Sequence, residues 1–194
     1  MILFGASGHA KVVSSACQEN ISFYFDDEAD GNMFHGKEVV VYDKKRSTNE
    51  KLIIAIGDNK IRRVIAEKVD HNFGSVVATS AEVDSSVILN EGSQILHGTI
   101  IQCNVRIGAH SIVNTGASVD HDCTIGDFCH LAPQVTLCGN VSIGNGTMVG
   151  AGSTVIPGVK IGDWCTIGAG SVVLTDIPNG ATAVGNPARV IKNK

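Results

Sequence analysis

The sequence predicts a Rossmann-like α/β unit over residues 1–77 and a left-handed parallel β-helix over residues 78–175, followed by a C-terminal tail over 176–194. The main observation is a period of six. From Val83 to Ile167 every sixth residue is aliphatic, fifteen times in a row, and a small or β-branched residue lies four places after each. A short fixed period is typical of a solenoid, whose turns bury their apolar side chains only against neighbouring turns. Before Val83, short apolar segments alternate with glycine-rich turns and helical segments, as in α/β proteins.

The composition agrees with this fold and excludes some functions. The chain has 22 glycines and only 5% aromatic residues, which suits a core of stacked small aliphatic layers. A net charge of −4 argues against nucleic-acid binding. No apolar run reaches membrane length, and the N-terminus does not resemble a signal peptide, so we expect a cytoplasmic protein. No Cys-x-x-Cys pair occurs, and Cys123, Cys129 and Cys165 fall in the small inward column, so we expect no metal and no disulfide.

In the α/β unit we expect strands at 2–4, 21–25, 36–42, 52–56 and 73–77, and helices at about 10–19 and 60–69. Three turns follow strands directly: the glycine-rich residues 5–9, the pair Asp26 and Asp27, and residues 57–59. Ligands of parallel α/β sheets bind at the carboxyl ends of strands, and a helix N-terminus favours anions. Each turn also has a simpler interpretation, as a tight turn or a solvated loop.

The period of the β-helix predicts which residues lie one coil apart. Six residues on each of three sides give 18 per coil and five coils between Val83 and Val172. His121 and His130 lie outside the buried columns, so we expect neither to be a satisfied core histidine. They are nine residues apart, which is half a coil. We therefore expect them on opposite parts of one subunit, so that they can share a site only across subunits. This predicts a homotrimer with active sites at its interfaces; the alternative is two unrelated exposed histidines.

The same period places Gly139 one coil after His121, where its backbone N–H could stabilise an oxyanion. It also places Ala151 below Ala169, so that an extended ligand parallel to the axis could bind their backbone amides.

The hexapeptide columns resemble those of the left-handed β-helix acyltransferases. The run from Asn114 to His130, with residues 5–9, Asp26-Asp27 and 55–59, resembles the bacterial nucleotide-amino-sugar N-acetyltransferases, including those that act on UDP-4-amino-4,6-dideoxysugars. The resemblance implies acetyl-CoA as co-substrate and acetyl transfer to the 4-amine of a nucleotide sugar, with UDP favoured. It makes His121 the general base and Asp122 its acidic partner, where the family often has Glu. It also implies acetyl-CoA contacts at His130 and nucleotide-sugar contacts at Ser7, Gly8, His9, Asp26, Asp27 and Gly57.

Chemistry agrees with direct aminolysis of the thioester, since a histidine next to a carboxylate is a suitable proton acceptor. The inward spacing of Cys123 and Cys129 makes a covalent acyl-cysteine an unfavourable alternative. Arg189 and Lys192 could meet the CoA phosphates or form a solvated tail. Two other functions stay open: O-acetylation of a sialic acid or another sugar hydroxyl, and a non-catalytic sugar-nucleotide-binding trimer. The nucleotide (UDP, GDP or CMP) is also open.

Overall fold

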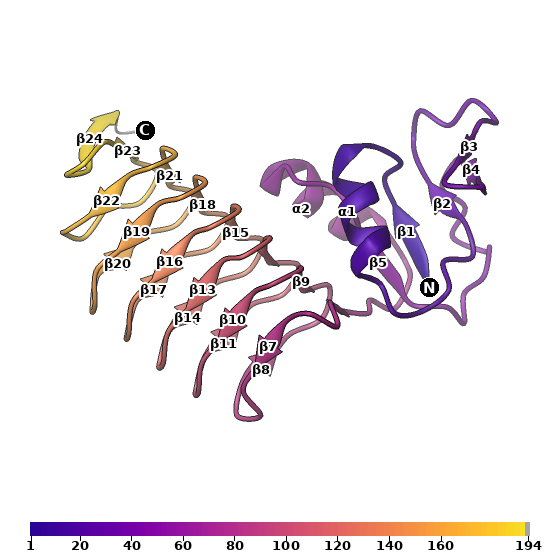
Figure 1. Ribbon diagram of the computed structural model, residues 1–194. Helices are drawn as coiled ribbons and strands as arrows, with labels where there is room; N and C mark the ends of the chain where they lie inside the picture. Colours follow the sequence, from indigo (N-terminus) through magenta and orange to yellow (C-terminus); the bar gives the residue numbers. More distant parts are fainter. Residues whose placement is uncertain (193–194) are drawn as a thin grey trace.

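The computed structural model describes residues 1–192 and has two parts, an N-terminal α/β unit and a three-sided prism of stacked coils (Figure 1). The N-terminal unit is built on one sheet in which β1, β2, β4 and β5 run parallel and β3 pairs antiparallel with β4. In sheet order its strands are β3 (Met33–Phe34), β4 (Lys37–Val40), β2 (Tyr24–Phe25), β1 (Ile2–Phe4) and β5 (Leu52–Ile54).

Two helices follow strands of this sheet. Helix α1 (Gly8–Ala16) begins after β1, and its N-cap Ser7 makes no side-chain capping bond. Helix α2 (Asn59–Lys68) begins after β5, and the side chain of Asp58 accepts hydrogen bonds from the backbone N–H groups of Lys60 and Ile61. Because Asp58 caps α2, its carboxylate is committed to local structure, whereas the start of α1 stays open.

The prism has three faces, which we name after their first strands. The β7 face contains β7 (Glu82–Val83), β10 (Ile100–Ile101), β13 (Ser118–Val119), β16 (Thr136–Leu137), β19 (Thr154–Val155) and β22 (Val172–Val173). The β8 face contains β8 (Ile88–Leu89), β11 (Arg106–Ile107), β14 (Thr124–Ile125), β17 (Ser142–Ile143) and β20 (Lys160–Ile161). The β6 face contains β6 (Val76–Val77), β9 (Gln94–Ile95), β12 (Ile112–Val113), β15 (His130–Leu131), β18 (Met148–Val149), β21 (Thr166–Ile167), β23 (Thr182–Val184) and β24 (Arg189–Lys192).

Three corners join these faces, and we name each after one of its residues. The His121 corner connects the β7 and β8 faces, the Asp127 corner connects the β8 and β6 faces, and the Ala151 corner connects the β6 and β7 faces.

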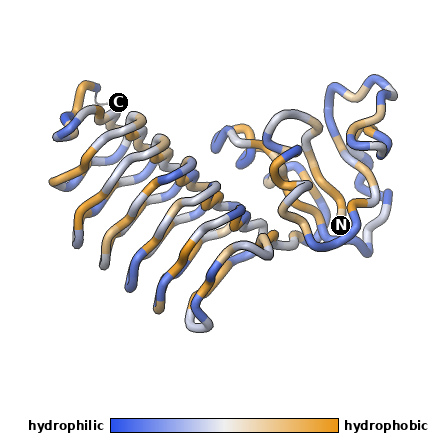
Figure 2. Tube along the Cα trace, viewed as in Figure 1, coloured by the Kyte–Doolittle hydropathy of each residue, from blue (hydrophilic) through white to orange (hydrophobic). Residues whose placement is uncertain are grey.

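The hexapeptide period holds as a strict structural register. Successive strands of a face pair in parallel at 18-residue spacing, as in Ser118 with Thr136 and Thr124 with Ser142. Both predicted columns point inward, and from Ser93 onward their members are buried. In Figure 2 each coil alternates between hydrophobic and hydrophilic segments. Each coil therefore buries its aliphatic residues against the coils above and below, as the sequence predicted.

The N-terminal unit packs on the first coils of the β6 face. Ala10, Val13 and Ala16 of α1 share one apolar cluster with Leu96 and Ile112 of the prism. Polar contacts cross the same boundary: Gln94 Nε2 donates to the Ile54 carbonyl at 2.9 Å and Asn59 Nδ2 to the Gly146 carbonyl at 3.1 Å. The outward side chains of the first coils of this face, at Gln94, Ile112 and His130, are therefore covered within a single chain.

Arg62 of α2 fastens the two parts together. Its side chain is fully buried and donates to the carbonyls of Ile56 and Gly57 in the N-terminal unit. On the prism it donates to the carbonyls of His110, Phe128 and Cys129. Burial lowers the pKa of Arg62 to about 10, so the guanidinium stays protonated at neutral pH. The carbonyl oxygens that accept its hydrogen bonds stabilise the buried charge in place of a carboxylate.

The structure differs from the sequence prediction at several element boundaries. Helix α1 starts two residues earlier and ends three residues earlier than expected, and only Tyr24–Phe25 of the second segment pairs as a strand. The predicted strand 73–77 does not join the N-terminal sheet as a unit. Phe73 makes one isolated bridge to Leu52, whereas Val76–Val77 pairs with β9 in the β6 face. Local hydrophobicity identified the apolar segment but could not say which sheet it joins, because strand pairing is non-local.

Candidate active site

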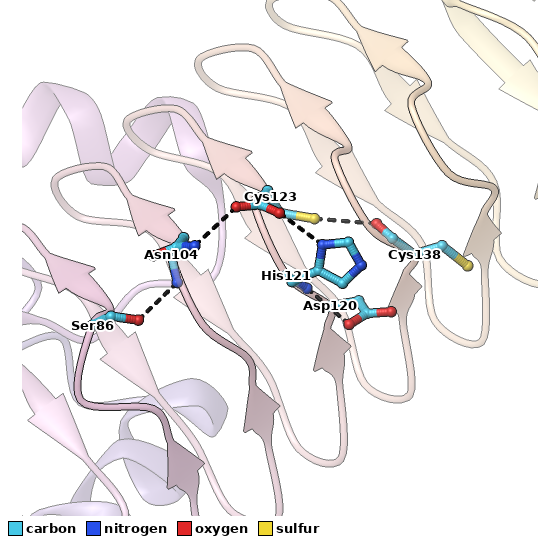
Figure 3. Close-up of polar contacts among 7 residues, drawn as sticks. Ser86, Asn104, Asp120, His121, Cys123 and Cys138 are labelled. Carbon is cyan, nitrogen blue, oxygen red and sulfur yellow. Dashed lines mark hydrogen bonds and ion pairs between the residues drawn. The ribbon is translucent and has the colours of Figure 1, made fainter.

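His121 lies at an exposed corner of the prism. It follows β13 and precedes β14, and 54% of its side chain is exposed. Its backbone N–H donates to Asp120 Oδ1 (Figure 3), at 2.8 Å. Asp122 adopts a left-handed conformation with φ of 59°. Asp and Asn tolerate this conformation better than most residues. The corner therefore holds two carboxylates beside one histidine.

The ring of His121 is oriented by Asp122. Nδ1 lies 2.8 Å from Asp122 Oδ2, and a carboxylate can only accept, so Nδ1 carries the hydrogen. This bond, followed by the charge of Asp120, raises the pKa of His121 above its ordinary value. The bond to His121 correspondingly lowers the pKa of Asp122. Nε2 is consequently the nitrogen that can take up a proton, with a basicity increased by its neighbours.

Gly139 lies directly beneath the ring. A Cβ atom at Gly139 would be 2.6 Å from both Cε1 and Nε2 of His121, so only glycine leaves room for the imidazole. Among residues 1–192, no acceptor pairs with the backbone N–H of Gly139. A cavity of about 470 Å³ adjoins the ring, and its lining consists of Asp120, His121, Cys138, Gly139, Asn140, Pro157 and Gly158. The corner thus combines a proton acceptor, an unpaired donor and space for a ligand.

His130 has a different environment from the one expected. It lies on β15 of the β6 face with 8% exposure, beneath the N-terminal unit. Its Nδ1 donates to the Gly57 carbonyl at 3.1 Å, and its Nε2 accepts from Asn114 Nδ2 at 3.0 Å. Burial lowers the pKa of His130 to about 4, so the ring is neutral. The expectation that His130 is not a satisfied buried histidine is therefore wrong, although its predicted contact with acetyl-CoA stays a prediction.

The predicted cofactor residues Ala151 and Ala169 lie at the Ala151 corner. Both are exposed, and the Gly170 N–H donates to the Ala151 carbonyl at 2.8 Å, so the two turns stack. Within residues 1–192 the N–H groups of Ala151 and Ala169 have no hydrogen-bond partner. Arg189 and Lys192 lie exposed on β24, at the far end of the β6 face. These small and basic residues lie at a different corner or face from His121.

The predicted sugar-nucleotide residues fall into separate groups. Ser7 and Asp26 line one cavity of about 320 Å³, where Asp26 Oδ2 accepts from the Ala6 N–H at 2.9 Å. Asp27 instead pairs with Lys68 Nζ at 2.7 Å. Gly57 lines another cavity, together with Trp164 and the start of α2.

The two remaining residues of that prediction lie at the start of α1. Gly8 is exposed at its first position, whereas the His9 ring turns toward the prism and its Nε2 lies 2.9 Å from Gln94 Oε1. Burial lowers the pKa of His9.

Sequence reasoning missed several residues that shape these sites: Asp120, Asn104, Asn114, Gln94 and Arg62. The 18-residue period could have found Asn104, which lies one coil before Asp122. Nothing in the period marks Arg62, because its partners lie on distant segments.

In the part of the chain from Met1 to Lys192, no group of three His, Cys, Asp or Glu side chains is arranged to hold a metal ion. Across the same residues, no helix has the length and apolar character that a membrane crossing requires. The described cysteines are all reduced, and burial raises the pKa of Cys129 to about 12.

The fold and the His121 corner define a hexapeptide-repeat acyltransferase, and comparisons with known proteins identify the family. Residues 1–69 match the PglD N-terminal domain, and residues 140–175 match the bacterial transferase hexapeptide (six repeats). No curated protein matches the chain.

Solved structures match the whole chain. A perosamine N-acetyltransferase mutant from Caulobacter crescentus, in complex with CoA and GDP-perosamine, is 38% identical with a TM-score of 0.92, covering 99% of this chain and 96% of that one. The acetyltransferase domain of PglB from Neisseria gonorrhoeae is 31% identical with a TM-score of 0.89, covering 98% of both chains. The chain belongs to the hexapeptide-repeat sugar N-acetyltransferases, with an N-terminal α/β domain and a left-handed β-helix.

Proposed function

We propose that this protein transfers the acetyl group of acetyl-CoA to the amine of a nucleotide-linked amino sugar. The observation that carries the proposal is the exposed His121–Asp122 pair above Gly139, beside a cavity of about 470 Å³. Similarity over the whole chain to an enzyme solved with CoA and GDP-perosamine supports the same chemistry. We assign sugar-nucleotide binding to a Rossmann-like domain of residues 1–77 and acetyl transfer to residues 78–175. The proposed reactants fit a cytoplasmic location.

The proposed reaction is direct aminolysis. The sugar amine attacks the thioester carbonyl carbon, a C–N bond forms, and the C–S bond breaks as the CoA thiol leaves. His121 Nε2 takes the proton that the amine loses and returns it to the departing thiolate. The Gly139 N–H donates to the carbonyl oxygen while that oxygen carries negative charge. Cys123 and Cys129 are buried, and the high pKa of Cys129 argues against an acyl-cysteine intermediate.

We further propose a homotrimer whose β7 faces surround the threefold axis. From the second coil onward the outward residues of this face are uncharged: Ile100, Ser118, Thr136, Thr154 and Val172. This face lies between the His121 corner and the Ala151 corner, so a neighbour packed on it would bring one subunit's His121 near the next subunit's Ala151 and Ala169. Acetyl-CoA would then bind along the Ala151 corner, where two exposed N–H groups have no partner among residues 1–192. Arg189 and Lys192 are the proposed contacts for its phosphates, and His130 remains a proposed contact for its acetyl end.

The nucleotide sugar is assigned to the turns after β1 and β2. Ser7 and Asp26 line the same cavity, and the start of α1 offers backbone N–H groups without a side-chain cap. Gly8 belongs to that start, whereas His9, Asp27 and Gly57 are engaged with Gln94, Lys68 and His130 and would support the pocket from outside.

One assay tests the reaction. CoA release is measured with 4-amino sugars linked to UDP, GDP and CMP, and with matched 4-hydroxy sugars. Release with an amino sugar supports the proposal and identifies the nucleotide. The sequence resemblance favours UDP, whereas the similarity to perosamine N-acetyltransferase favours GDP. Release only with hydroxyl sugars would replace it by O-acetylation, and release with none would leave a binding trimer.

Subunit sharing is tested by complementation. Trimers containing both His121→Ala and Ala169→Trp subunits are isolated with two affinity tags. Each variant alone should be inactive, and the mixed trimer should regain activity because one interface pairs an intact His121 with an intact Ala169. A monomer in sedimentation experiments, or a mixed trimer without activity, contradicts the shared site.

A further inference from the structure

The corner that holds His121 contains a row of polar side chains that extends toward the first coil. Ser86, Asn104 and Asp122 follow one another at 18-residue spacing, one coil apart. Figure 3 shows Ser86 and Asn104 on neighbouring coils before His121. Asn104 has φ of 61° and Asp122 has φ of 59°, so both occupy the left-handed conformation that Asn and Asp tolerate. Their side chains consequently leave the backbone in the same direction and can meet along the prism axis.

Asn104 contacts the oxygen of Asp122 that His121 does not use. Asn104 Nδ2 donates to Asp122 Oδ1 at 3.1 Å, whereas His121 Nδ1 donates to Oδ2 at 2.8 Å. The amide orientation is fixed by chemistry, because an ionised carboxylate accepts and never donates. Each oxygen is thus held from one side, so rotation of the carboxylate would break one of the two bonds.

Asn104 is itself held from the preceding coil. Its backbone N–H donates to Ser86 Oγ at 2.8 Å, and Ser86 Oγ donates to Asp84 Oδ1 at 2.6 Å. The two Ser86 hydrogen bonds lower the pKa of Asp84, so this first acceptor is ionised. The row therefore connects Asp122 to a fixed turn of the first coil.

This support matters because the His121–Asp122 pair is exposed. Both side chains are more than half accessible, with 54% and 51% exposure. Exposed ion pairs contribute little on their own, since solvent screens them and each side chain loses rotamer freedom on pairing. A neighbour that fixes the carboxylate removes much of that entropic cost before the histidine bonds to it.

We propose that Asn104 is a positioning residue for catalysis, which orients Asp122 so that the carboxylate keeps His121 in the proton-accepting tautomer. The proposal rests on the proposed role of His121 as general base. Asn104 touches neither reactant and acts only through Asp122.

Two substitutions at this position test it. Asn104→Gly removes the amide without backbone strain, because glycine accepts positive φ. We expect kcat to fall about threefold to tenfold, the usual net range for loss of one hydrogen bond. Asn104→Asp keeps the shape but replaces the donor by a second carboxylate, which repels Asp122 and should also lower kcat. Ser47→Gly, at another residue with positive φ (54°) in the N-terminal unit, is the matched control and should leave kcat unchanged.

The pKa of His121, followed by NMR without substrate, separates positioning from a merely structural role. Asn104→Gly should lower this pKa toward the ordinary value of about 6.5, since the bond to Asp122 weakens. Asn104→Asp should raise it, because a negative charge is added nearby. In an Asp122→Ala background, Asn104→Gly should have no further effect on kcat or on the pKa.

The outcomes are distinct. A loss of kcat with an unchanged pKa of His121, or additive effects in the Asp122→Ala background, would overturn the proposal. If His121→Ala retains activity, the general-base assignment fails instead, while the NMR titration still reports whether Asn104 orients Asp122.

Discussion

Two corners of the same prism carry different side chains at the same position of the hexapeptide. At the Asp127 corner, side-chain oxygens accept from the backbone N–H of the preceding coil: Asp127 from Ala109, Asn145 from Asp127, Asp163 from Asn145 and Asn179 from Asp163, at 2.7–2.8 Å. At the His121 corner this position holds His121 and then Gly139. The Gly139 N–H has no partner among residues 1–192, and the His121 ring lies over it.

The difference shows how one fold provides both a stabilising row of corner hydrogen bonds and a candidate active site. A short acceptor side chain at each coil satisfies the corner's backbone donors and stabilises the stack. At the His121 corner the position one coil after Gly139 is Pro157, whose side chain has no acceptor, so the Gly139 N–H stays unpaired among the described residues and the titratable ring of His121 lies beside it. Polar groups left unsatisfied at a corner of an otherwise regular stack indicate function more than stability.

The largest expected effect comes from removing the ring at the His121 corner. His121→Ala should lower kcat by about 10²–10⁴-fold, the usual contribution of a general base, with little change in melting temperature because the side chain is exposed. His97→Ala is the matched control, since His97 occupies the same hexapeptide position at the Ala151 corner and bonds to Ser15 and Ser80. Activity of His121→Ala within about tenfold of the unsubstituted enzyme would refute the base assignment.

Filling the space beneath the ring should have the next largest effect. Gly139→Ala places a Cβ at 2.6 Å from His121 Cε1 and Nε2, so the ring must move away from its position over the N–H. We expect kcat to fall by about 10²-fold, near the value of one misaligned oxyanion donor. Steady-state kinetics at saturating acetyl-CoA measures this. Unchanged kcat in a folded variant would show that the ring and the N–H need not be adjacent.

The pH dependence should reveal the carboxylate partner. Because Asp122 raises the pKa of His121, the acidic limb of kcat/KM should have its midpoint above about 6.5. Activity should be lost as the pH falls through this midpoint, because a protonated ring cannot accept a proton. Asp122→Asn removes the negative charge, so the midpoint should move to lower pH while the maximal rate also falls. An identical acidic limb in both enzymes would mean that another group titrates.

The smallest effect on rate is expected at the Asp127 corner. Asn145→Ala removes the acceptor for the Asp127 N–H and should cost about 1 kcal/mol of stability, the usual net value of one hydrogen bond. Calorimetry should show a lower melting temperature, while kcat stays at the level of the unsubstituted enzyme. A loss of kcat without loss of stability would remove the distinction between the two corners.

The sequence determined the prism and the local geometry of His121. The period of six is repeated along the chain, so it fixes which residues point inward and which lie one coil apart, including His121 above Gly139. The same period would have placed Asn104 before Asp122, although amide and carboxylate orientation required the three-dimensional turn with its positive φ values.

What covers each outer face of the prism depends on how distant parts of the chain pack together. His130 has the same outward position on its strand as Met148 one coil later, yet it is buried because the N-terminal unit packs on it and Gly57 accepts its hydrogen bond. Arg62 joins the two parts through carbonyls that lie as many as 67 residues away in the chain. A period describes neighbours within a repeat, whereas burial of an outward side chain depends on packing between segments distant in sequence. This physical difference explains why the His121 corner was predictable and the environment of His130 was not.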